Sequence, residues 1–114
     1  MITIEEFRKL ALSFPDATEE PHFEKTSFRV NKKIFATFDE INNQAVVKLS
    51  PLDQSVFCSF DKAVMHPVNG TWGGRGWTVI ELDKVKRAML KDALRTAYQN
   101  LSAKSNKNYI LREK

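Results

Sequence analysis

The alternation of apolar and polar residues between positions 26 and 49 constrains the fold of this chain more than any other feature. The segments 26–30, 33–39 and 44–49 repeat with the period of two that is typical of a half-buried β-strand. Each segment is short, and polar residues separate it from the next one. The pattern therefore predicts an antiparallel meander of three strands that turns one face toward a core.

The middle segment shows which side chains should share that face. If 33–39 is a regular strand, Ile34, Ala36 and Phe38 lie on one face and Phe35 and Thr37 on the other. Before it, Asn31-Lys32 fits a two-residue hairpin turn, since Asn tolerates the positive φ that such turns need.

Helix signals stand on both sides of the meander. Thr3 followed by Glu6 matches a capping box, and apolar residues then recur at helical spacing as far as Phe14. Ser50-Pro51 is typical of a helix start, and we expect a short helix over 51–58. Asp83 is expected to cap a last helix over about 84–102.

The remaining segments complete the expected order. We expect an acidic loop over 15–25 and a strand over 78–82. A strand over 63–68 stays open, because Pro67 weakens it. The result is an α+β domain, an antiparallel sheet flanked by N- and C-terminal helices, in the order α-β-β-β-α-(β)-β-α. We expect residues 1–114 to form a single domain with a basic C-terminal tail over 103–114.

Cysteine usage and hydropathy indicate the compartment. With Cys58 as the only cysteine among 114 residues, no intramolecular disulfide can form. The N-terminus lacks the basic and apolar regions of a signal peptide, and no apolar run approaches the roughly 20 residues that span a bilayer. We therefore expect a cytoplasmic protein with no membrane partner.

No known catalytic motif occurs in the sequence. His22 and His66 lie far apart, and neither is at ligand spacing from Cys58, which is most simply a buried small hydrophobe. Phosphate loops, nucleophile elbows and H-E-x-x-H are absent from the sequence. We expect no catalytic residues, no metal, no cofactor and no enzymatic activity.

Charge is distributed unevenly along the chain. Residues 1–83 hold nine Lys/Arg and twelve Asp/Glu, a net of −3, whereas residues 84–114 hold nine and two, a net of +7. One face of the last helix would carry Lys84, Arg87, Lys91 and Arg95, which could bind DNA phosphates. In this hypothesis Lys32, Lys33 and Arg75 are peripheral contacts. A solvated helix surface explains the same charges equally well.

The segment 71–77 supports a second hypothesis. Three glycines surround Arg75, and Trp72 and Trp77 lie at its ends. With His22, these three side chains could line a pocket for a small molecule or peptide. The simpler alternative is a glycine-rich turn whose tryptophans anchor it to the core.

The tail suggests a third hypothesis. Its apolar cluster Tyr109, Ile110 and Leu111 could mediate protein interaction or a homodimer. The oligomeric state stays open.

Several short motifs, spread over nearly the whole chain, resemble one protein family. They are Glu20-Pro21-His22-Phe23, Ser27-Phe28-Arg29-Val30, Lys33-Ile34-Phe35-Ala36-Thr37, Gly76-Trp77 and Ala97-Tyr98. Together they are similar to the MmcQ/YjbR-like family, which has a CyaY-like, double-wing fold. The resemblance implies an antiparallel sheet flanked by helices at its ends and on one face. It also implies a DNA-binding label, but fold does not establish function.

The frataxin relatives that share the CyaY-like fold bind iron, and this property is not expected here. Binding of a hard cation requires clustered carboxylates, and the first helix offers only Glu5 and Glu6.

Overall fold

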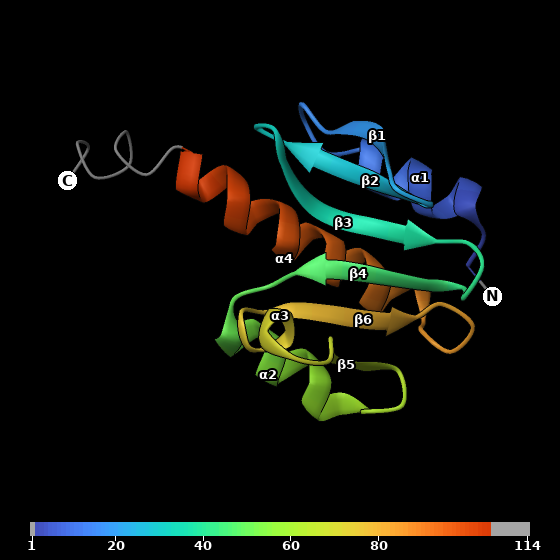
Figure 1. The fold of residues 1–114 in the computed structure, drawn as a ribbon, viewed down its shortest axis with the longest axis vertical. Helices are drawn as coiled ribbons and strands as arrows, with labels where there is room; N and C mark the ends of the chain where they lie inside the picture. The colour runs from blue at the N-terminus through green and yellow to red at the C-terminus, as the bar shows by residue number, and fades with distance from the viewer. Residues whose placement is uncertain (1, 106–114) are drawn as a thin grey trace.

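The computed structural model describes residues 2–105 and places six strands in one antiparallel sheet (Figure 1). The order of strands across the sheet is β1-β2-β3-β4-β6-β5. Along the chain, the elements are α1 (Ile4–Leu12), β1 (Thr18–His22), β2 (Lys25–Val30), β3 (Lys33–Asp39), β4 (Gln44–Lys48), α2 (Pro51–Phe60), β5 (Met65–Pro67), α3 (Thr71–Gly74), β6 (Trp77–Glu81) and α4 (Arg87–Ser105). The α+β architecture with terminal helices is as the sequence predicts.

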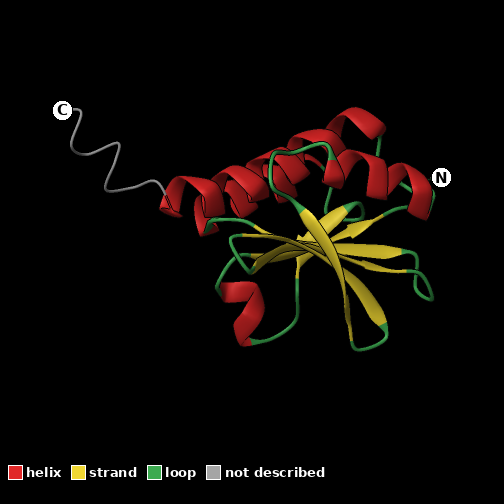
Figure 2. Ribbon diagram, turned by 90° about the horizontal axis from the view of Figure 1, so that it is seen from above, coloured by secondary structure: helices red, strands yellow, loops and turns green. Residues whose placement is uncertain are grey.

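The two faces of the sheet have different coverings. The long helices lie over one face, and the other face carries only a short helix at one end (Figure 2). Between the sheet and α1 and α4 lies the core, in which Phe7 packs against Phe28 and Phe38 at ring distances of 5.4 and 5.1 Å. Leu90 and Leu94 of α4 are fully buried there. The sheet thus has one face, the open face, that α1 and α4 do not cover.

The local signals for the first two helices and the hairpin turn are confirmed. The Thr3 Oγ1 accepts a hydrogen bond from the Glu6 amide at 3.2 Å, and the Ser50 Oγ accepts one from the Asp53 amide at 3.1 Å. Asn31 and Lys32 both have positive φ, 54° and 66°, which defines a type I′ turn between β2 and β3.

The expected acidic loop over 15–25 is wrong, because residues 18–22 form strand β1. All five of its residues pair with β2, from Thr18 opposite Arg29 to His22 opposite Lys25. Arg8 of α1 donates to both carboxylate oxygens of Glu19, at 2.6 and 3.1 Å. The sequence Thr-Glu-Glu-Pro-His has no apolar alternation, so this edge strand depends on its neighbours rather than on its own pattern.

The open question over 63–68 is answered by the short strand β5, which pairs with β6 at the other edge of the sheet. Pro67 is its last residue, a position that costs no ladder hydrogen bond inside the sheet.

A β-bulge overturns the expected faces of β3. Phe28 pairs with Ala36, but the next residue, Arg29, pairs with Ile34, so Phe35 is the extra residue. Phe35 packs on the helix side, against Tyr98 at 5.8 Å. Ile34 and Thr37 are left together on the open face, where both line the same groove. Strict alternation fails because one inserted residue reverses the parity of the strand.

The last helix begins later than expected. α4 starts at Arg87, and Asp83 and Lys84 lie in the turn before it. In that turn the Glu81 carbonyl accepts from the amides of Lys84 and Val85, at 3.1 and 3.0 Å. Asp83 is therefore not the helix cap.

Candidate ligand-binding groove

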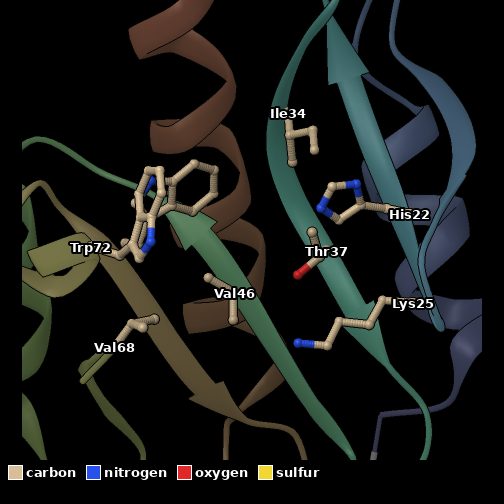
Figure 3. Close-up of a pocket in the computed structure, with 8 residues that line it drawn as sticks. His22, Lys25, Ile34, Thr37, Val46, Val68 and Trp72 are labelled. Carbon is tan, nitrogen blue, oxygen red and sulfur yellow. The ribbon is translucent and has the colours of Figure 1, made fainter. Parts of the chain in front are cut away.

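A groove of ≈ 550 Å³ runs across the open face of the sheet (Figure 3). Its residues come from the β1–β2 hairpin, from β3 and β4 in the middle, and from the segment around α3 and β6 at the far side. The lining residues are His22, Lys25, Ile34, Thr37, Val46, Val68, Trp72 and Trp77.

The hairpin forms the polar wall of the groove. His22 and Lys25 are cross-strand partners on either side of its tip, so both side chains point to the same face. Both extend toward the middle of the groove in Figure 3. Within residues 2–105, the Lys25 ammonium makes no hydrogen bond or ion pair, so it is available to a ligand.

The floor of the groove consists of Ile34, Thr37 and Val46. Thr37 and Val46 face each other across β3 and β4, and the bulge at Phe35 brings Ile34 to the same side as Thr37. The Thr37 side chain is 8% exposed, and among the described residues its hydroxyl has no hydrogen-bond partner. The floor is thus apolar, with one polar group near its centre.

The aromatic wall is formed by Trp72 and Trp77. Their rings meet edge to face, with centroids 6.5 Å apart. The Arg75 guanidinium lies 5.3 Å from the centre of the Trp72 ring, and the Lys48 ammonium 6.0 Å from that of Trp77. Lys48 also donates to the Arg75 carbonyl at 2.7 Å, which ties this turn to β4.

Two glycines allow this wall to lie so close to the sheet. A Cβ on Gly73 would fall 1.8 Å from the Val68 carbonyl oxygen, and one on Gly76 would fall 1.8 Å from that of Leu49. Gly76 also has a φ of 106°, which favours glycine. These glycines allow close backbone packing, which agrees with the simpler alternative of a glycine-rich turn. Trp72, however, is 58% exposed and is not buried in the core.

The residues of the pocket hypothesis lie together. His22, Trp72 and Trp77 line one groove, and Arg75 covers the Trp72 ring.

Sequence reasoning missed Lys25 and Thr37. Lys25 could have been found from the hairpin register if β1 had been recognised. The expected alternation already placed Thr37 on the face away from Ala36 and Phe38, whereas the position of Ile34 beside it depends on a bulge that has no signal in the sequence.

The residues of the DNA hypothesis are spread more widely. Lys84, Arg87, Lys91 and Arg95 are all exposed. Arg87, however, donates to Glu6 at 2.8 Å, which raises the pKa of its guanidinium, and Arg95 lies 3.6 Å from Asp92. Of the four basic positions, Lys84 and Lys91 have no carboxylate partner among the described residues.

The peripheral contacts of that hypothesis lie away from the start of α4. Lys33 shares a surface hollow with Leu101, near the C-terminal end of α4. Arg87 starts the helix, and Leu101, 14 positions later, is about 21 Å away along the axis at 1.5 Å per residue. Arg75 lies beside the aromatic wall instead. The tail cluster Tyr109, Ile110 and Leu111 is outside the described residues.

The other side chains with reactive groups, Cys58 and His66, have their contacts within the fold. Cys58 is buried in the core, and burial raises the pKa of its thiol. His66 contacts Glu81 at 2.9 Å, and Gln44 donates to the same carboxylate at 3.0 Å. Among residues 2–105, no three His, Cys, Asp or Glu side chains gather as a metal site would require. In the same part of the chain, no helix is long and apolar enough to cross a membrane.

The fold is that of an α+β domain whose helices cover one face of a six-stranded antiparallel sheet. The chain belongs to the YjbR family, whose model matches residues 12–100. It is similar to the crystal structure of Deinococcus radiodurans protein DR2400, which has a DUF419 domain, with a TM-score of 0.80. That match covers 92% of this chain and 82% of the other at 20% identity, and so shows the fold alone. No curated protein matches the chain.

Proposed function

We propose that this protein is a non-enzymatic binding module that holds a small molecule or short peptide in the groove on the open face of its sheet. The observation that carries the proposal is the groove itself. It has ≈ 550 Å³ between a wall with two tryptophans and a wall with His22 and Lys25. This volume is in the usual range for sites that bind small ligands, which combine apolar walls with a few polar groups.

Trp72 supports this proposal most directly. More than half of its surface is exposed, although it belongs to a short helix that close glycine contacts hold against the sheet. A large exposed aromatic on a rigid support is typical of a binding surface, because covering it releases water at little conformational cost.

A thermal-shift screen with a metabolite and peptide library tests the proposal, using the wild type, Trp72→Ala and a control variant, Phe60→Ala. Phe60 is 67% exposed on α2, away from the groove. A true ligand should raise the melting temperature of the wild type and of the Phe60 variant, and lose most of that effect in the Trp72 variant. A library in which no compound distinguishes Trp72→Ala from Phe60→Ala would contradict the proposal.

DNA binding through α4 and the turn before it is a second candidate, because Lys84, Arg87, Lys91 and Arg95 are all exposed. Arg87 and Arg95 also face carboxylates within the protein, so Lys84 and Lys91 give the cleaner test. Reversing both to Glu should weaken binding to labelled duplex DNA in an anisotropy titration and lower the salt slope by about two.

The matched control for DNA binding is the double reversal of Lys9 and Lys62, which are exposed elsewhere. Equal losses in the two double variants would mean that the positive charge acts generically, and would remove α4 as a DNA-binding surface.

A further inference from the structure

We infer that the groove takes an elongated aromatic ligand with an anionic group at one end, its ring against Trp72 and its anion beside Lys25. This inference rests on the proposed function and adds the chemical class of the ligand.

The charges around the groove favour an anion. Lys25 and His22 are the lining residues that can carry charge, and no carboxylate lines the groove. The nearby Asp39 carboxylate accepts hydrogen bonds from the amide and side chain of Asn42, at 3.2 and 2.8 Å. Burial opposes its ionisation, but these hydrogen bonds and the more distant Lys25 outweigh burial and lower the pKa of Asp39. Lys25 acts on Asp39 as a nearby charge, but within residues 2–105 it forms no ion pair with it, so its ammonium can still bind an anion at the groove.

The aromatic wall disfavours a cationic ligand. Tryptophan rings attract cations, but here Arg75 already lies at the Trp72 ring and Lys48 at that of Trp77. A cationic ligand would therefore meet the two positive charges that are already at this wall. A neutral or electron-poor aromatic ring meets no such repulsion and can pack on the exposed part of Trp72.

The sheet sets the length of the ligand. Three strand spacings separate β2, which carries Lys25, from β6, which carries Trp77. At about 4.8 Å per spacing the strands are about 14 Å apart, and the register puts Lys25 in the row of Glu81, four residues and about 13 Å along β6 from Trp77. Lys25 and Trp72 extend inward from opposite sides in Figure 3, so a ligand that reaches both walls must be elongated. The Thr37 hydroxyl lies between them and can bond a polar atom in the tether.

Three probes test the ligand class: naphthylhexanoate, naphthylhexyl phosphate and naphthylhexanamide. They share the ring and a similar length, and they differ in the end group. Binding is measured by NMR titration that follows the indole and Lys25 signals, with wild type, Lys25→Glu, Lys62→Glu and Trp72→Ala. Lys62 is an exposed lysine away from the groove and serves as the matched charge reversal.

We expect at least one anionic probe to bind the wild type about fivefold more tightly than the amide, a modest ratio because Lys25 is exposed and its charge screened. Lys25→Glu should abolish this preference, Lys62→Glu should keep it, and Trp72→Ala should weaken all three probes. A preference for the carboxylate would indicate carboxylic acids as natural ligands, and a preference for the phosphate would indicate phosphate esters.

Two results would overturn the inference. One is that the amide and both anions bind the wild type with equal affinity, and that Lys25→Glu weakens binding no more than Lys62→Glu does. In that case, weaker binding of the probes to Trp72→Ala would still support a binding groove, and only the preference for an anionic ligand would be rejected. The other is the absence of any shift in the indole signals with all three probes, after which the metabolite screen decides the proposed function by itself.

Discussion

At the scale of single residues, the glycines of the segment 71–77 differ in whether they leave room for a side chain. A Cβ on Gly73 or on Gly76 would overlap a backbone carbonyl oxygen of another segment, whereas a Cβ on Gly74 would have nothing within 4 Å. The oxygens belong to Val68 and Leu49, and backbone cannot move aside as a flexible side chain can.

We therefore expect Gly76→Ala to lower the free energy of unfolding by about 3 kcal/mol, since it combines overpacking with a positive φ. Gly73→Ala should cost about 2 kcal/mol through overpacking alone. Gly74→Ala is the control and should stay within about 0.5 kcal/mol of the wild type. Urea unfolding measures all three, and equal stability of the three variants would show that these close approaches do not constrain the fold.

At the scale of elements, Gln54 joins three of them. From α2, its Nε2 donates to the Gly73 carbonyl of α3 at 2.9 Å and to the Trp77 carbonyl of β6 at 3.2 Å. A third contact, to the Thr78 hydroxyl, is 3.1 Å long. One amide thus fixes the position of the aromatic wall against the sheet.

Gln54→Glu keeps the size of this side chain but replaces its donors with a carboxylate that faces three oxygen atoms. We expect it to lower the free energy of unfolding by about 2 kcal/mol, because the partner acceptors lose their donor. The fluorescence of the two tryptophans should change as well. Gln99→Glu, on the exposed side of α4, is the control and should leave both measurements unchanged. If the two variants behave alike, Gln54 does not position the wall.

At the scale of the whole molecule, one sheet and one core connect the two ends of the protein. The hydrophobic cluster extends from Ile2 through β3 and β6 to Leu101. The tryptophans lie near one edge of the sheet, whereas most of the helical backbone belongs to α1, α2 and α4. If these parts form one domain, they should unfold together.

We expect a single urea transition in which tryptophan fluorescence and far-UV circular dichroism have the same midpoint. Trp72→Ala, which removes an exposed ring, should keep the two midpoints equal while it reduces the fluorescence signal. Separate midpoints in the wild type would show that the α3–β6 region unfolds independently, and would contradict a single cooperative domain.

The sequence by itself determined the features that depend on local chemistry. Thr3, Ser50-Pro51 and Asn31-Lys32 act through neighbouring backbone, and the alternation over 26–49 predicts the meander. The class of fold follows from these signals together.

Only the tertiary structure decided β1, the bulge at Phe35 and the composition of the groove. Within residues 2–105, strand β1 pairs only with β2, and the bulge puts Phe35 on the side of the sheet where it packs against Tyr98 of α4. The groove needs Lys25, Thr37 and Trp72, which meet only when the whole sheet has formed. Such contacts join residues far apart in the chain, and their energies depend on packing and register, which no local pattern contains.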